Sequence, residues 1–393
     1  MNEPGRWMRR SGCVGVLLAT LGLYGCGLDS AREGAPTGDI FRHAHVLGSA
    51  SPSAKGWTPM DYWQAYNVVH DSSDAQRFRG TKTAVIVAYH NSHLQNDLNT
   101  FCKKFSIKAP TLTIINQAGN VTNAEWALEG SADVAMVVTA NPWTTLYVIE
   151  AKSDSRNDLL TAIETAVNLG AEVITMSFGV DEFSEEGAYA HLFLNASVTW
   201  VAASGDSSTP SFPATLPDVI AVGGTTLSSV APFTETTWTN AGAGISLYQV
   251  KPSFQKIAPV LELNATTFRS LPDVAFNADP FFGMQVYSSI YGGWVVVGGT
   301  SIAAPFFAGV VSMANASRKR LQKPLFTSVA NSPLSLQKSL YALLPTSGGP
   351  TILHDVVQGS SGDERYLAGP GYDIATGLGS LNVSELIDYL DSR

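Results

Sequence analysis

One serine stands where its hydroxyl could act as a nucleophile. Residues 298–309 read Gly-Gly-Thr-Ser-Ile-Ala-Ala-Pro-Phe-Phe-Ala-Gly, and the apolar run continues to Ala316. A glycine turn that leads into an apolar, buried helix places the Ser301 hydroxyl beside free backbone N–H groups and the positive end of the helix dipole. These groups suit a developing oxyanion, so Ser301 is a candidate nucleophile for acyl transfer. The alternative is that Ser301 only caps a core helix, as serines commonly do.

Two carboxylates with helical spacing could serve as the partners of this serine. Residues 126–142 read Trp-Ala-Leu-Glu-Gly-Ser-Ala-Asp-Val-Ala-Met-Val-Val-Thr-Ala-Asn-Pro. The i, i+4 spacing puts Glu129 and Asp133 on one helical face, so that a glutamate in contact with the serine could be backed by an aspartate. Carboxylates this close share protons, which tunes one of them for proton transfer. Glu125 and Glu129 are also four apart, and a solvated pair on a helix surface remains a further alternative.

The serine segment resembles the Gly-Thr-Ser-x-x-x-Pro motif that subtilisins and sedolisins share. Subtilisins pair this serine with an aspartate at the end of the first strand and with a histidine followed by Gly-Thr. Here the first expected strand ends Val-Ile-Val-Ala-Tyr at residues 85–89, and none of the seven histidines is followed by Gly-Thr. The subtilisin triad therefore lacks two of its three members in this chain.

Sedolisins, the serine-carboxyl peptidases, use a glutamate and an aspartate four residues apart on one helix. In that family the segment runs Trp-Ala-Leu-Glu, three residues, Asp, and then eight residues to a proline that precedes a strand. Glu129, Asp133 and Pro142 match this pattern without a gap, which favours Glu129 and Asp133 over the pair that begins at Glu125. The resemblance implies an acid-acting peptidase that forms an acyl-enzyme on Ser301.

Two further segments resemble parts of the sedolisin active site. Residues 204–207 read Ser-Gly-Asp-Ser, like the family loop in which a protonated aspartic acid donates to the oxyanion. A carboxyl kept neutral can serve as such a donor, so the resemblance gives this role to Asp206, although an isolated aspartate there would more commonly be a turn residue. The segment Ser177–Gly179 is expected to line the peptide cleft, because a glycine lets a substrate backbone approach.

A pair of segments near the C-terminus resembles the sedolisin calcium site. Residues 354–356 read His-Asp-Val, and residues 369–373 read Gly-Pro-Gly-Tyr-Asp. The resemblance implies Ca²⁺ held by carboxylates and backbone carbonyls of Asp355, Val356, Gly369, Gly371 and Asp373. Five protein oxygens plus water would meet the about six to eight ligands that calcium takes. The alternative is a glycine-rich turn with two solvated carboxylates.

Short apolar runs alternate with longer amphipathic ones along most of the chain. The runs that predict buried strands are Ala84–Ala88, Leu146–Glu150, Val173–Met176, Val198–Ala202 and Val219–Val222. The segment Asp158–Leu169 predicts a helix with one apolar face. Nearly all-apolar strands that alternate with helices indicate a parallel sheet covered on both faces. We therefore expect an α/β, subtilisin-like, doubly wound fold over residues 57–393.

The N-terminus resembles a bacterial lipoprotein signal. Three arginines within residues 6–10 precede an apolar run from Cys13 to Gly25, which is too short for the about 20 residues that span a bilayer. Cys26 follows in a lipobox-like context, so we expect a signal peptide at 1–25 and a lipidated cysteine with a flexible tether at 26–56. An ordinary signal peptide or a retained anchor are the alternatives. The tether is too short for the large prodomain of the family, so we expect a member that lacks one.

The composition limits the classes of partner. Loss of residues 1–25 changes the formal net charge from −9 to −11, and an acidic surface repels nucleic acid. We expect a monomer, exported and lipid-anchored to a bacterial membrane at the outer membrane or cell surface, that acts on peptides or unfolded proteins. The rival hypotheses are a non-catalytic peptide-binding lipoprotein with the same fold and a subtilisin-like enzyme with a displaced histidine.

Overall fold

The computed structural model describes residues 41–42, 45–47, 56–256, 266–344 and 352–393. The chain divides into two compact units, residues 1–37 and 38–393, and every described residue belongs to the second. The expected signal peptide and Cys26 lie outside the described residues. No helix in the described part of the chain is long and apolar enough to cross a membrane.

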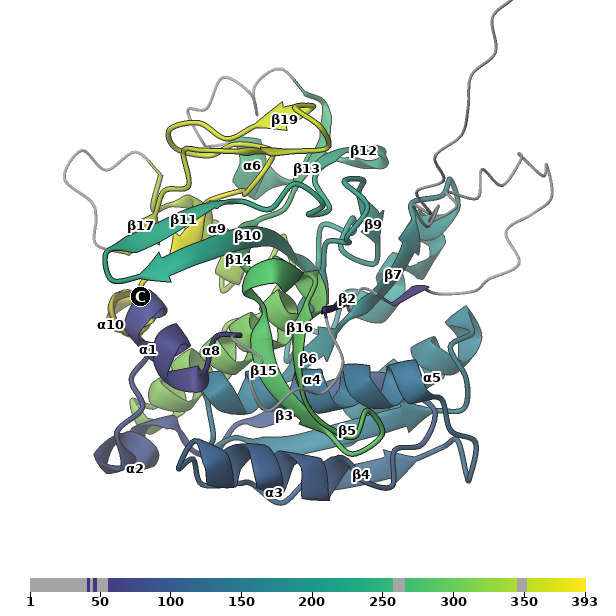
Figure 1. Ribbon diagram of the computed structural model, residues 1–393. Helices are drawn as coiled ribbons and strands as arrows, with labels where there is room; N and C mark the ends of the chain where they lie inside the picture. The colour runs from purple at the N-terminus through teal and green to yellow at the C-terminus, as the bar shows by residue number, and fades with distance from the viewer. Residues whose placement is uncertain (1–40, 43–44, 48–55, 257–265, 345–351) are drawn as a thin grey trace, which may run out of the picture. The chain divides into compact units, whose positions relative to one another are not determined.

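The core of the second unit is a mainly parallel sheet (Figure 1) with the strand order β11-β10-β8-β6-β3-β5-β4, to which β14 adds by pairing with β10. Only β10 and β11 pair antiparallel within this sheet. Its strands are β3 (Lys82–Ala88), β4 (Thr113–Asn116), β5 (Thr145–Ala151), β6 (Val173–Met176), β8 (Thr199–Ala203), β10 (Ile220–Val230), β11 (Phe233–Thr237) and β14 (Val274–Asn277). The chain starts the sheet at its middle and extends it in both directions, so the predicted doubly wound α/β fold is confirmed.

Two helices that pack against each other carry the candidate catalytic residues. They are α4 (Ala124–Ala140) and α8 (Thr300–Arg320), and α8 also packs against the strands in the middle of the sheet. The two helices touch at Gly309, where a Cβ atom would lie 2.6 Å from Ala140 Cβ and 2.7 Å from the Val137 carbonyl oxygen. A larger side chain at Gly309 would therefore push the helices apart.

Two small sheets flank the start of α8. In the first, β7 (Phe178–Asp181) pairs with β9 (Ser211–Phe212) on one side and with β1 (Phe41–Arg42) on the other. In the second, β16 (Gly293–Gly298) pairs with β15 (Met284–Ser288) and with β2 (His45–Leu47). The compact unit begins at Gly38, earlier than Trp57, where we expected the folded domain to start, and β1 and β2 lie in the segment expected to be a tether.

The other elements complete the unit around this frame. The helices are α1 (Pro59–Tyr66), α2 (Ala75–Phe78), α3 (Leu94–Lys104), α5 (Arg156–Asn168), α6 (Ser253–Lys256), α9 (Leu336–Tyr341) and α10 (Val383–Ser392). The short 3-10 segments are η1 (Ser72–Asp74), η2 (Glu186–Phe193) and η3 (Pro280–Phe282). The short strands are β12 (Gly244–Val250), β13 (Phe268–Leu271), β17 (Leu353–His354), β18 (Ser360–Ser361), β19 (Tyr366–Leu367) and β20 (Ser380–Leu381).

Candidate active site

Ser301 is the second residue of α8, directly after the turn that ends β16. Gly299 in that turn has φ 108°, a backbone conformation that favours glycine. The Ser301 side chain is fully buried (0% exposed), and its Oγ has no hydrogen-bond partner among the described residues. A serine inside the helix with an unbonded hydroxyl is not a cap, so the capping alternative is wrong. No described residue therefore holds this hydroxyl in a structural hydrogen bond.

The carboxylates Glu129 and Asp133 lie one turn apart on α4, and both are fully buried. The Glu129 carboxyl group interacts with Asp133 and lowers the pKa of Asp133, against the rise that burial causes. Glu125, the competing partner, is exposed at the start of the same helix. The solvated pair considered as an alternative is therefore excluded for Glu129 and Asp133, and burial favours them over Glu125.

Ser177 links the carboxylates to the serine. This residue follows β6 at the carboxyl edge of the sheet, and its Oγ donates to Asp133 Oδ1 at 2.7 Å. The same Oγ also lies within hydrogen-bonding distance of the Ser301 carbonyl oxygen, at 3.1 Å. The structure thus brings Glu129, Asp133 and Ser301 into one connected cluster.

Burial sets the protonation of this cluster. It raises the pKa of Asp133 well above the ordinary aspartate value, and the hydrogen bonds with Ser177 and Glu129 oppose that rise only in part. A protonated Asp133 can donate to a carboxylate while its other oxygen accepts from Ser177. Burial therefore favours the protonated form of Asp133, while proton sharing between the two carboxyl groups stays a prediction.

Asp206 lies beside the first residue of α8. Its Oδ1 accepts hydrogen bonds from the Thr300 backbone N at 2.8 Å and from Thr300 Oγ1 at 2.7 Å. Burial raises the pKa of Asp206 to about 7, although both bonds from Thr300 favour its charged form. Asp206 therefore joins the loop after β8 to the start of the catalytic helix, which a simple turn residue would not do. Below about pH 7 its carboxyl is protonated and can donate.

Sequence reasoning missed the linking role of Ser177 and the positioning role of Thr300. The sequence predicts only that Ser177 lines the cleft, and it gives Thr300 no role beyond its place in the serine motif. A serine directly after a buried parallel strand is a weak indication of such a role, because active sites of open α/β sheets lie at the carboxyl ends of strands. Neither contact can be derived from residue spacing.

The two segments expected to bind calcium lie next to each other. The Gly371 backbone N donates to Asp355 Oδ2 at 2.9 Å, and the Gly369 backbone N donates to Asp373 Oδ2 at 2.9 Å. Asp373 Oδ1 accepts from the Thr376 backbone N at 2.8 Å. In the described ranges, no group of three or more acidic, histidine or cysteine side chains is arranged so that it could hold a metal ion. Two carboxylates and nearby backbone carbonyls are hard oxygen donors, which fit calcium better than a transition metal.

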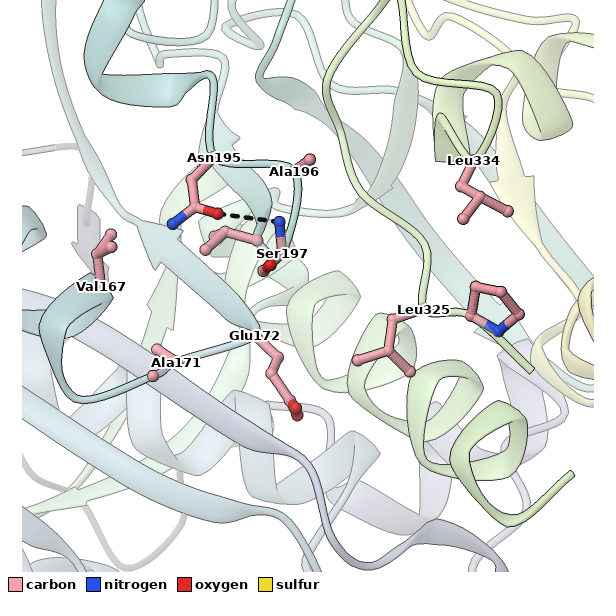
Figure 2. Close-up of a pocket in the computed structure, with 11 residues that line it drawn as sticks. Val167, Ala171, Glu172, Asn195, Ala196, Ser197, Leu325 and Leu334 are labelled. Carbon is pink, nitrogen blue, oxygen red and sulfur yellow. Dashed lines mark hydrogen bonds between the residues drawn. The ribbon is translucent and has the colours of Figure 1, made fainter. Parts of the chain in front are cut away.

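A cavity of about 440 Å³ lies elsewhere in the unit and is shown in Figure 2. Its lining includes Glu172, directly before β6, and Ser197, just before β8. It is therefore at the amino ends of these strands, whereas Ser177 and Ser204 follow their carboxyl ends. Glu172 pairs with Lys319 at 2.5 Å, and the Ser197 backbone N donates to Asn195 Oδ1. This cavity is separate from the catalytic cluster.

Comparisons with known proteins agree with this fold. The profile of the subtilase family matches residues 64–328. Sedolisin of Pseudomonas sp. (strain 101) is 27% identical over 93% of this chain and 67% of its own length. Kumamolisin of Bacillus sp. (strain MN-32) is 30% identical over 84% of this chain and 63% of its own length. Tripeptidyl-peptidase 1 of Homo sapiens is 28% identical over 77% of this chain.

The chain spans about two thirds or less of the length of these relatives, since it covers 58% of the human protein. Among solved structures, a Pseudomonas sedolisin, described as a serine-carboxyl proteinase complexed with two molecules of pseudo-iodotyrostatin, superposes with a TM-score of 0.73. That match has 26% identity and covers 87% of this chain and 99% of the sedolisin chain. The chain therefore belongs to the subtilase family of serine-type peptidases.

Proposed function

We propose that the chain is an acid-acting serine-carboxyl peptidase that hydrolyses peptide bonds through an acyl-enzyme on Ser301. The observation that carries this proposal is the buried connection from Glu129 and Asp133 through Ser177 to Ser301. His90, which follows the first strand of the central sheet, instead pairs with the buried Glu150 at 2.6 Å. A carboxylate pair is therefore a better candidate base than a displaced histidine.

Each residue has a defined step in this reaction. Glu129 takes the proton of Ser301 Oγ while Oγ attacks the substrate carbonyl carbon, and Asp133 stabilises the charge on Glu129. Asp206 and the start of α8 donate hydrogen bonds to the oxyanion. Glu129 then protonates the leaving amine, which leaves an ester on Ser301. Glu129 then takes a proton from the water that attacks this ester and returns it to Ser301 Oγ as the acid product departs.

The proposed acid range of activity follows from the protonation of Asp206, the proposed oxyanion donor. Asp206 donates only when its carboxyl carries a proton, and its pKa of about 7 makes that form dominant below neutrality. Above pH 7 the carboxylate would repel the oxyanion. The proposed enzyme therefore loses its electrophilic assistance as the pH rises, while the packing around Ser301 stays the same.

Three variants test the proposal against the non-catalytic alternative. We expect the wild-type chain to cleave denatured casein at pH 4 and to form an adduct with a peptide aldehyde at Ser301, detected by mass spectrometry. Ser301→Ala and Glu129→Gln should abolish cleavage. Glu125→Gln is the matched control, because it removes an exposed carboxylate from the same helix and should leave cleavage unchanged. Peptide binding without cleavage or adduct in the wild-type chain would identify a binding protein instead.

We also propose that the chain binds Ca²⁺ and is exported. The calcium ligands would be the carboxylates of Asp355 and Asp373 and the carbonyl groups of Val356, Gly369 and Gly371. Calcium would cross-link residues 354–356 with residues 369–373 and would take no part in the chemistry at Ser301. Export rests on the basic and apolar N-terminus and on Cys26, whose acylation would hold a monomeric peptidase on an outward-facing membrane surface.

A further inference from the structure

The loop that carries Asp206 is held by a second loop, residues 238–242, which follows β11 and is named the bracing loop. Three hydrogen bonds join the two loops, and they lie on both sides of Asp206 in the sequence. They run from the Gly242 backbone N to the Gly205 carbonyl oxygen (2.5 Å), from the Ser208 backbone N to the Asn240 carbonyl oxygen (3.1 Å), and from Ser208 Oγ to the Thr239 carbonyl oxygen (2.9 Å). The bracing loop therefore fixes the backbone before and after Asp206.

The two loops approach most closely at Gly242. A Cβ atom on this glycine would lie 2.2 Å from the Ser204 carbonyl oxygen and 2.8 Å from the Gly205 backbone N. These atoms belong to the backbone, so they cannot rotate away as the end of a flexible side chain can. A larger residue at position 242 would therefore shift residues 204 and 205, which directly precede Asp206.

The bracing loop is also anchored beside the turn that precedes the nucleophile. Trp238 and Ala241 form a small apolar cluster with Ala278, in which both alanines are fully buried. The Ala278 carbonyl oxygen accepts from the Gly299 backbone N at 2.6 Å. The same short loop thus connects the loop of the proposed oxyanion donor to the turn that begins α8.

A hairpin near the C-terminus, made of β18 and β19, holds the bracing loop as well. The Gly362 backbone N donates to the Thr239 carbonyl oxygen at 2.9 Å. Ser361, whose side chain is fully buried, donates from its Oγ to the Ala241 carbonyl oxygen at 2.7 Å. The bracing loop is therefore bonded both to the Asp206 loop and to this hairpin, which limits its movement.

The position of an oxyanion donor decides how much it contributes. Such a donor acts when it lies about 2.7–3.1 Å from the place that the charged oxygen will occupy. A misplacement of about 1 Å can cost about 10²-fold in rate. Thr300 holds Asp206 from the side of α8, and the bracing loop holds its backbone.

We propose that Gly242 is a positioning residue, whose lack of a side chain lets the bracing loop hold Asp206 where it can donate to the oxyanion at Ser301. This inference rests on the proposed function, because it assigns a further residue to the same site. Gly242 acts through Asp206, so its replacement should lower kcat rather than raise KM. The loss should also disappear when Asp206 is absent.

Gly242→Ala tests the close contact in the full-length chain. Gly187→Ala is the matched control, because a Cβ atom at that exposed glycine would meet nothing within 4 Å. With a fluorogenic peptide at pH 4, Gly242→Ala should lower kcat by about 10²-fold and leave KM within about twofold, whereas the control should change neither. In the Asp206→Ala background, Gly242→Ala should lower kcat by less than about threefold. Equal losses with and without Asp206 would overturn the inference.

Ser361→Ala is a second variant that perturbs the bracing loop without adding an atom. It removes the hydrogen bond to the Ala241 carbonyl oxygen, so kcat should fall by about three- to tenfold, again only when Asp206 is present. Circular dichroism shows whether each variant is folded. If Gly242→Ala does not fold, the dependence of the Ser361→Ala loss on Asp206 decides the question.

A titration of Asp206 supplies a readout without catalysis. Carbon-13 NMR of aspartate-labelled chains gives its pKa, with Asp206→Asn to assign the signal. A shift of residues 204 and 205 should weaken the bonds from Thr300, which favour the charged form, so Gly242→Ala should raise this pKa by about one unit. Gly187→Ala should leave it unchanged. A pKa that is the same in both variants would overturn the inference. A raised pKa in a chain that cleaves no peptide would support the positioning role and refute the peptidase proposal.

Discussion

Replacing Asp206 by asparagine should show how much of the pH dependence of kcat comes from the proposed oxyanion donor. Both hydrogen bonds from Thr300 reach Oδ1 of Asp206, so the proton of the acid form belongs on the other oxygen. The amide of Asp206→Asn can keep both bonds through its carbonyl oxygen and place its NH₂ group where that proton was. The amide donates at every pH, whereas the carboxyl donates only when protonated.

The size of the effect follows from the pKa of about 7 for Asp206. At pH 9 only about one carboxyl in 100 is protonated, which corresponds to about 2.7 kcal/mol. This agrees with the about 10²- to 10³-fold loss that follows removal of one oxyanion donor. Between pH 5 and pH 9 the wild-type kcat should therefore fall about 100-fold, while kcat of Asp206→Asn should change by less than about tenfold.

The assay is kcat for a fluorogenic peptide from pH 4 to pH 9, with circular dichroism at each pH to show that the chain stays folded. Thr300→Val gives a second check, because the Thr300 hydroxyl lowers the pKa of Asp206. Its removal should therefore move the alkaline limb of the pH profile, the range in which kcat falls, to higher pH. If Asp206→Asn loses activity with the same midpoint as the wild type, another group controls the alkaline limb and the argument fails.

Four further outcomes are expected. Ser301→Ala and Glu129→Gln should each lower kcat by about 10³-fold or more, and the double variant should lose little more, since the groups act as one unit; additive losses in steady-state kinetics would contradict this. Chelation should lower the melting temperature of the wild type but not that of Asp373→Ala, because a ligand that binds only the folded state stabilises it; identical calorimetric curves with and without chelator would refute calcium binding. Cys26→Ser should move the protein from the membrane fraction to the soluble fraction, and continued membrane association with metabolic lipid labelling would refute the anchor. Burial raises the pKa of Glu186 and of Asp206 to about 7. Their favourable contribution to the free energy of unfolding is therefore complete below about pH 4 and is lost as the pH rises to about 7, so the melting temperature should fall over this range. A melting temperature that rises steadily from pH 4 to pH 8 would show that other groups dominate.

The central sheet could be predicted from the sequence because buried parallel strands are continuous apolar runs. The expected strand Val173–Met176 has the bounds of β6, and the expected Val198–Ala202 differs from β8 by one residue at each end. Strands β1 and β2 could not be predicted. They are only two and three residues long, and their partners lie far away in the chain. Pairing of this kind depends on tertiary context.

The placement of Glu129 and Asp133 on one helical face was predictable for a different reason. Spacing on one helix is a local property, so Glu129 and Asp133 could be placed on one face before any fold was known. The structure adds that Glu129 and Asp133 are buried whereas Glu125 is exposed, which favours the first two as the pair. The link through Ser177 was not predictable, because it joins the end of a strand to the side of a helix and depends on how α4 packs on the sheet.

The end of the first strand, where subtilisins carry an aspartate, is occupied by other contacts in this chain. After the first strand, the Tyr89 hydroxyl donates to Asp154 at 2.9 Å, and Trp126 Nε1 donates to the same carboxylate at 3.4 Å. That strand end is therefore occupied by a structural contact. The proposed proton acceptor, Glu129, and its partner, Asp133, lie instead on one helix, where they are fully buried. Burial raises the pKa of Asp133 in this helix and of Asp206 beside it, so the packing that holds the catalytic groups in contact also favours their protonated forms. The acid range of action that we propose would follow from a site built of buried carboxyl groups.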